Sequence, residues 1–188
     1  MPVLKTKFLP FPELRTERLN MRRIVDSDLE RLFALRSNTT IMRYIHRPLA
    51  KTPDDASALL KKLDDGIDNG TGITWGITAK EDNSLIGTIG YWRIEPDNFR
   101  AEIGYLIDEP YQGKGLMTEA INAVADFGFK EMSLHSIEAR VVPSNNASAK
   151  LLEKNGFIKE GYFKESIAFN GKFGDAAVYS RLNPHHVE

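Results

Sequence analysis

The sequence predicts a mixed α/β fold built on a largely antiparallel sheet. The chain has 188 residues, of which 41% are hydrophobic and 27% charged, as expected for one globular domain with a well-filled core. Three strand-like runs rich in isoleucine, tryptophan, tyrosine and threonine follow one another between residues 73 and 107, with short polar turns between them. The chain closes on two further strand-like runs around Asn170-Gly171, a dipeptide typical of a tight hairpin.

The first third of the chain predicts one strand, two helices and a short helical piece. Apolar residues alternate over residues 14–24, which indicates a strand. The acidic stretch that begins at Asp26 precedes an apolar stripe with helical spacing, and a short helical piece is expected around residues 41–45. Thr52 stands before a proline and two aspartates, which is a favourable helix start, and this helix should end near Asn69-Gly70.

The rest of the chain changes repeatedly between strand and helix periods. A glycine-rich turn follows the third strand-like run and opens a helix, because apolar residues then recur at helical spacing. The expected elements are strands at residues 73–79, 85–94 and 101–107, a helix to residue 127, a strand at 136–142, a helix at 145–155, and strands at 157–169 and 173–182. The predicted sheet thus has about seven strands. We expect residues 1–13 to form an N-terminal arm and residues 183–188 a polar tail.

The composition excludes several classes of function. Lysine plus arginine number 25 and aspartate plus glutamate 26, so the net charge of −1 gives no support for binding nucleic acid or an anionic membrane surface. No apolar run approaches the ~18 residues that span a bilayer, and residues 1–12 lack the apolar core of a signal peptide. Cysteine is absent, which excludes thiolate metal sites and agrees with a cytoplasmic location. The histidines show no metal-ligand spacing with acidic residues, so no metal site is expected.

The most informative feature is the turn at residues 110–118, which lies between a predicted strand and a predicted helix. Backbone N–H groups at a helix start have no partner within the helix, and the helix dipole favours negative charge there. Gly113 and Gly115 would let the backbone approach a ligand closely. The turn therefore predicts a site for a phosphate group.

Two common phosphate-binding motifs do not fit this turn. A Walker loop needs a glycine where Asp108 stands and a serine or threonine where Gly115 stands. A dinucleotide-binding fingerprint needs a small residue where Thr118 stands, and it belongs in a parallel βαβ unit rather than after an antiparallel meander. Neither motif is therefore the favoured interpretation.

The pattern Gln112-x-x-Gly115-x-Met117 resembles the acetyl-CoA-binding segment of the GNAT superfamily of N-acetyltransferases. The family pattern is Gln/Arg-x-x-Gly-x-Gly/Ala, so Met117 replaces its final small residue. Because the binding groups are backbone amides, this replacement leaves the donor at that position in place.

Three further segments strengthen the resemblance. Residues 142–157 are similar to the Pro-x-Asn-x-x-Ser…Leu-Glu-Lys-x-Gly-Phe stretch of the RimJ/RimL-like branch, the ribosomal-protein N-terminal acetyltransferases. Residues 14–19 and 101–105 also agree with that branch. The resemblance covers roughly residues 14 to 182, and the four segments occur in the same order.

The resemblance implies acetyl transfer from acetyl-CoA to a primary amine by direct attack. It also implies a sheet in which two neighbouring strands separate and admit the pantetheine arm, with the turn amides on the pyrophosphate. The implied acetyl-CoA-binding residues are Tyr105, Leu106, Ile107, Gln112, Gly113, Lys114, Gly115, Leu116, Met117, Thr118 and Asn145. Two of them have alternative interpretations, Lys114 as a solvated loop lysine and Asn145 as a helix N-cap.

Two residues are candidates for the chemistry. The resemblance implies that Ser148 protonates the departing CoA thiolate, whereas the alternative is a serine in a helix-capping turn. Glu102, in the centre of a predicted strand, is the candidate base that takes the proton of the attacking ammonium, directly or through water. Its alternative is a structural carboxylate paired with a neighbouring arginine.

The expected acceptor is a protein N-terminal α-amine of the ribosomal-protein type, because an α-amine loses its proton more readily than a lysine. The alternatives are a small-molecule amine (polyamine, amino acid or antibiotic) and a non-catalytic acyl-CoA-binding module. Residues 39–65 and 168–175 are expected to shape the acceptor groove. Trp92 is expected in the core, with the acceptor groove as the alternative. A homodimer is a further expectation from the family, and no direct contact with nucleic acid or membrane is expected.

Overall fold

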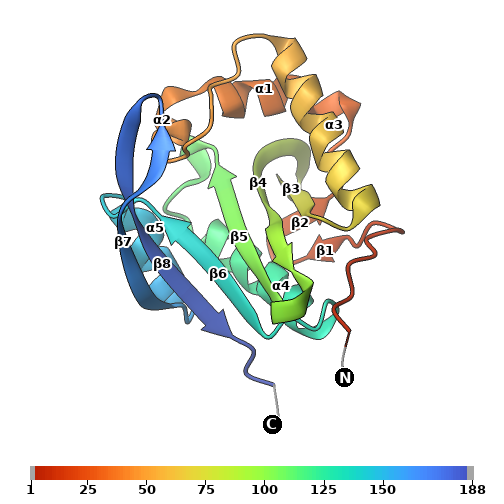
Figure 1. Ribbon diagram of the computed structural model, residues 1–188. Coiled ribbons are helices and arrows are strands. Elements are labelled where there is room, and N and C mark those ends of the chain that lie inside the picture. Colours follow the sequence, from red (N-terminus) through yellow and green to blue (C-terminus); the bar gives the residue numbers. More distant parts are fainter. Residues whose placement is uncertain (1–2, 186–188) are drawn as a thin grey trace.

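The fold is an eight-stranded sheet with helices on both faces, seen in a computed structural model that describes residues 3–185 (Figure 1). The strand order is β1-β2-β3-β4-β5-β6-β8-β7, and every neighbouring pair is antiparallel except β5 with β6. The predicted class is therefore confirmed. The elements are β1 (Leu14–Arg15), β2 (Leu19–Arg22), η1 (Asp26–Asp28), α1 (Leu29–Ser37), α2 (Thr39–Met42), α3 (Pro53–Asn69), β3 (Ile73–Ala79), β4 (Asp82–Glu95), η2 (Pro96–Asn98), β5 (Arg100–Ile107), η3 (Glu109–Tyr111), α4 (Leu116–Lys130), β6 (Ser136–Val141), α5 (Asn146–Lys154), β7 (Ile158–Phe169) and β8 (Lys172–Leu182). Residues 1, 2 and 186–188 of the predicted arm and tail lie outside the described residues.

The predicted strand at residues 14–24 is two short strands joined by a tight turn, which brings the sheet to eight strands. Thr16 forms this turn. Its backbone N–H donates to the carbonyl of Leu19 at 3.0 Å, and its Oγ1 accepts from the Leu19 N–H at 3.0 Å. A threonine hydroxyl thus satisfies a backbone donor locally, and apolar alternation alone does not reveal such a turn.

The helices begin where capping side chains satisfy their first N–H groups. α3 begins after Thr52, which forms a capping box with Asp55, and it ends at Gly70, whose φ of 67° is left-handed. α2 is a single turn that starts before the predicted piece at 41–45, because the Asn38 side chain accepts from two backbone N–H groups there. No helix within residues 3–185 is long and apolar enough to cross a membrane.

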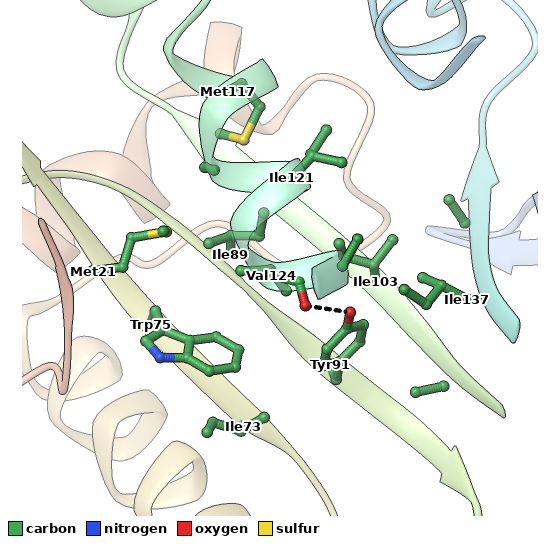
Figure 2. Close-up of a cluster of buried hydrophobic side chains, with 14 of the residues drawn as sticks. Met21, Ile73, Trp75, Ile89, Tyr91, Ile103, Met117, Ile121, Val124 and Ile137 are labelled. Carbon is green, nitrogen blue, oxygen red and sulfur yellow. Dashed lines mark hydrogen bonds between the residues drawn. The ribbon is translucent and has the colours of Figure 1, made fainter. Parts of the chain in front are cut away.

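The two faces of the sheet bury separate apolar clusters. The larger cluster packs α4 against one face of the central strands and contains Trp75 and Tyr91, both fully buried (Figure 2). The smaller cluster packs α1 and α3 against the opposite face and contains Leu32, Leu60 and Leu106. Because apolar residues of β4 and β5 contribute to both clusters, these central strands are held from both sides.

The pairing of β5 with β6 is short, and this positions the site described below. The two strands are parallel and pair only from Arg100 opposite Ser136 to Glu102 opposite Glu138. Beyond that point β5 continues to Ile107 still paired with β4, while β6 continues to Val141 paired with β8. The neighbouring strands therefore separate in the middle of the sheet.

The buried Tyr91 hydroxyl ties β4 to α4, since it donates to the carbonyl of Val124 at 2.8 Å (Figure 2). We expect Tyr91→Phe to lower the free energy of unfolding by about 1–2 kcal/mol, because a buried hydrogen bond is lost. Denaturation in guanidinium chloride measures this change. Tyr44→Phe is the matched control, because the Tyr44 hydroxyl makes no hydrogen bond in the described part of the chain. Equal effects of the two substitutions would contradict the prediction.

Candidate active site

The glycine-rich turn has the geometry of an anion site. It connects η3 to α4, and both Gly113 (φ 71°) and Gly115 (φ 77°) adopt the left-handed conformation that favours glycine. No side chain caps the start of α4. Among the described residues, none accepts a hydrogen bond from the backbone N–H groups of residues 113–118. A continuous run of available donors therefore lies at the positive end of the α4 dipole.

Contacts from the β1–β2 hairpin hold the glycine-rich turn in place. Arg18 donates from Nη1 to the carbonyl of Lys114 at 3.0 Å and forms an ion pair with Glu119 in the first turn of α4. The Thr16 hydroxyl donates to the same carboxylate at 2.7 Å. Burial alone would raise the pKa of Glu119, but the bonds from Thr16 and Arg18 outweigh it and lower that pKa. The segment at 14–19, recognised only as a sequence match, thus fixes the position of the turn.

Met117, which replaces the small residue of the family pattern, points away from the turn. Its side chain is buried in the larger core cluster beside Ile121 (Figure 2). The unusual residue therefore packs against the sheet, and the available amides of the turn are not covered by it.

Tyr105 and Ser148 meet where β5 and β6 have separated. The Tyr105 hydroxyl and Ser148 Oγ lie 2.8 Å apart, which joins β5 to the first turn of α5. Burial raises the pKa of Tyr105 to about 12, although the bond with Ser148 acts in the opposite direction. Tyr105 is therefore protonated near neutral pH and can donate to Ser148 Oγ, which leaves the serine proton available to a third group.

Asn145 orients this serine. Its side-chain oxygen accepts from the Ser148 backbone N–H at 3.2 Å, which is the N-cap geometry of α5. The capping interpretation of Asn145 is thus confirmed. Its contact with the coenzyme stays a prediction, as do the coenzyme contacts of the other residues assigned from the sequence.

Glu102 lies at the last position where β5 pairs with β6, and two arginines lie near its carboxylate. Arg93 Nη1 donates to Glu102 Oε2 at 3.0 Å, and Arg140 Nε lies 3.9 Å from the same oxygen. Pairing with an arginine, the alternative given above for this carboxylate, is therefore present, and the role of Glu102 as a base stays a prediction. No hydrogen bond joins Glu102 to Ser148 in residues 3–185.

Trp92, expected in the core, leaves 39% of its surface exposed. It lies opposite Glu102 in the β4–β5 pairing. Its ring covers Gly104, since a Cβ atom there would lie 2.0 Å from the Trp92 ring. The indole therefore needs a glycine on the adjacent strand, and it forms an aromatic surface beside Glu102.

The comparisons with known proteins agree with this geometry. The sequence matches the family model described as an acetyltransferase (GNAT) domain over residues 18–158. The chain therefore belongs to the GNAT acetyltransferase family.

Relatives match over nearly the whole chain. An uncharacterized N-acetyltransferase of Bacillus subtilis, YoaA, is 37% identical over 174 residues, which are 93% of this chain and 98% of the relative. The ribosomal protein uS5-alanine N-acetyltransferase of Escherichia coli is 28% identical over 94% of this chain and 93% of its own. The structure of spermidine N-acetyltransferase from Vibrio cholerae, in complex with CoA and spermine, matches with a TM-score of 0.79 and 27% identity over 89% of this chain and 97% of its own. These relatives support N-acetyltransferase activity with acetyl-CoA as the donor.

The ion pair between Arg18 and Glu119 leads to a prediction for coenzyme binding. Glu119→Gln removes the charge that holds Arg18 and loosens the turn, so we expect the Kd for acetyl-CoA to rise about fivefold, as a loss of about 1 kcal/mol requires. Isothermal titration calorimetry measures this Kd. Asp126→Asn is the control, because Asp126 lies in the same helix and, within residues 3–185, forms an ion pair only with the exposed Lys130. The prediction is wrong if both variants bind acetyl-CoA as the unmodified protein does.

Proposed function

We propose that this protein transfers an acetyl group from acetyl-CoA to the N-terminal α-amine of a protein, of the ribosomal-protein type. The observation that supports this most directly is the Tyr105–Ser148 pair, which places a hydroxyl where β5 and β6 have separated. The full-length similarity to the uS5-alanine N-acetyltransferase of Escherichia coli supports the acceptor class.

The coenzyme would be held mainly by backbone groups. The available N–H groups of residues 113–118 match the negative oxygens of a pyrophosphate. Tyr105, Leu106 and Ile107 have no β6 partner, so the backbone groups on that edge of β5 can pair with the pantetheine amides. We propose no metal in this site.

The reaction then needs three proton transfers. Glu102 first takes a proton from the acceptor ammonium through water, and Arg93 keeps its carboxylate oriented. The neutral amine then attacks the thioester carbon, a C–N bond forms, and the C–S bond breaks to release CoA thiolate. Ser148, whose hydroxyl lies 2.8 Å from that of Tyr105, donates its proton to that thiolate and regains the proton that the new amide nitrogen loses.

A second candidate acceptor is a polyamine, because the spermidine N-acetyltransferase of Vibrio cholerae shares the fold at 27% identity. We also propose a cytoplasmic location, on the absence of cysteine and the use of acetyl-CoA. A homodimer remains a prediction from the family.

An acceptor screen tests the proposed function. We expect peptides with a free N-terminal alanine or serine to gain one acetyl group, read by mass spectrometry, and to release CoA in equal amount. The same peptides with a blocked N-terminus are the control. Faster acetylation of spermidine than of every peptide would instead support the polyamine acceptor, and binding of acetyl-CoA without any turnover would support a binding module.

Substitution of the two candidate residues tests the mechanism. We expect Ser148→Ala and Glu102→Gln each to lower kcat by about 100-fold or more, because each removes a proton-transfer group. The Kd for acetyl-CoA should stay within about twofold, since neither residue is needed for the backbone contacts. Ser57→Ala on α3 is the control, because among the described residues its hydroxyl hydrogen-bonds only to the carbonyl of Pro53 in its own helix. Unchanged rates would remove both residues from the mechanism.

A further inference from the structure

The segment of residues 31–53, from the first turn of α1 to the start of α3, is basic and contains no acidic residue. No aspartate or glutamate occurs between Glu30 and Asp54, although acids outnumber basic residues in the chain as a whole, 26 to 25. Arg36 and Arg47 lie in this segment, and neither forms an ion pair with a carboxylate within residues 3–185. We call these two residues the arginine pair.

The arginine pair brings two positive charges together without a counter-ion. Arg36 is half-buried at the end of α1, and its carbonyl accepts from the backbone N–H of Ala50 at 3.0 Å, so the returning chain passes beside it. Burial lowers the pKa of Arg36, and the charge of Arg47 lowers it further, with no carboxylate to offset either effect. The negative end of the α1 dipole favours a cation at the position of Arg36. It does not account for a second cation, Arg47, near the first.

The stretch of chain that carries the pair contacts two parts of the proposed site. Asn38, at the start of α2, donates to Glu109 in η3 at 3.1 Å, just before the glycine-rich turn. On the other side, the His46 ring packs edge-on against Phe169, with 5.6 Å between ring centroids. Figure 1 shows α2 beside the tip of the β7–β8 hairpin. The two segments predicted to shape the acceptor groove, residues 39–65 and 168–175, therefore meet here. Arg47 belongs to the first of them, and Arg36 lies three residues before it begins.

We propose that the arginine pair binds acidic side chains of the acceptor, so that the preferred acceptor is a protein N-terminus followed by acidic residues. This inference rests on the proposed function and names its substrate class. Guanidinium groups bind carboxylates through short charge-assisted hydrogen bonds, often in a bidentate geometry. A pair that has no internal counter-ion breaks no existing ion pair when it binds an anion, so it gains the full benefit of that contact.

The contrast with Arg31 supports this interpretation. Arg31 belongs to the same segment, but it donates to Asp108 at 2.7 Å and to the carbonyl of Leu85 at 3.2 Å, which fastens α1 to the sheet. Arg36 and Arg47 have no equivalent contact in the described residues. One arginine of the segment thus has a structural role, while the pair is left available to a ligand.

The test compares two peptides that begin with the same alanine. In one, the next five residues are glutamate and aspartate, and in the other they are glutamine and asparagine. We expect the unmodified protein to show a KM about tenfold lower for the acidic peptide, with a similar kcat, and added salt should reduce the difference. The doubly substituted variant Arg36→Gln/Arg47→Gln should lose this preference. Its Kd for acetyl-CoA should be unchanged and its melting temperature nearly so, because neither guanidinium forms an ion pair with a carboxylate in the described residues.

Arg15→Gln is the matched control, since Arg15 is an exposed arginine on β1, at the opposite edge of the sheet from the β7–β8 hairpin. Equal KM values for the two peptides in the unmodified protein would overturn the inference. A raised Kd for acetyl-CoA in the double variant would assign the pair to the coenzyme, and a lowered melting temperature would assign it a structural role.

Failure of the proposed function is distinguishable from failure of this inference. If neither peptide is acetylated, the proposed function fails. Fluorescence anisotropy with the labelled peptides, in the presence of CoA, still measures whether the acidic one binds more tightly. Tighter binding that the double variant loses supports the arginine pair, and equal binding overturns it.

Discussion

The site depends on the early end of pairing between β5 and β6. A parallel pair that stops at Glu102 and Glu138 leaves one edge of β5 without a strand partner, although β5 remains buried between two apolar clusters. Buried backbone donors and acceptors need partners, so such an edge is a place for a ligand that can supply them. The sheet does not lose its continuity, because β6 pairs with β8 along its whole length.

The parts around this edge are held together by contacts between segments far apart in the sequence. Arg18 and Glu119 link the first hairpin to α4, while Tyr105 and Ser148 link β5 to α5. The proposed coenzyme contacts are mostly backbone groups, and for this reason Met117 can occupy a position where the family has a small residue. Side-chain chemistry is confined to the few residues that would move protons.

Most elements could be predicted from the sequence, because apolar period and capping residues are local properties. Apolar alternation does not reveal the hairpin at Thr16, since one threonine hydroxyl interrupts a pattern that otherwise alternates regularly. The ion pair between Arg18 and Glu119 joins residues that no local pattern connects, so the sequence match at residues 14–19 does not by itself indicate a structural role. The sequence identifies Glu102 as either a base or a partner of an arginine, but only the fold shows which arginines reach it. The sequence predicts Trp92 in the core, because strand position alone does not show that the indole rests on a glycine of the next strand.

The packing of the Trp92 indole on Gly104 limits which substitutions this surface can accept. The Trp92 ring fills the space that a side chain at position 104 would need. A larger residue at 104 would therefore displace the indole, and a smaller residue at 92 would uncover the backbone of β5. Homologous chains should therefore change the two positions together. An engineered acceptor preference that alters one of them alone would begin from a steric conflict or a gap.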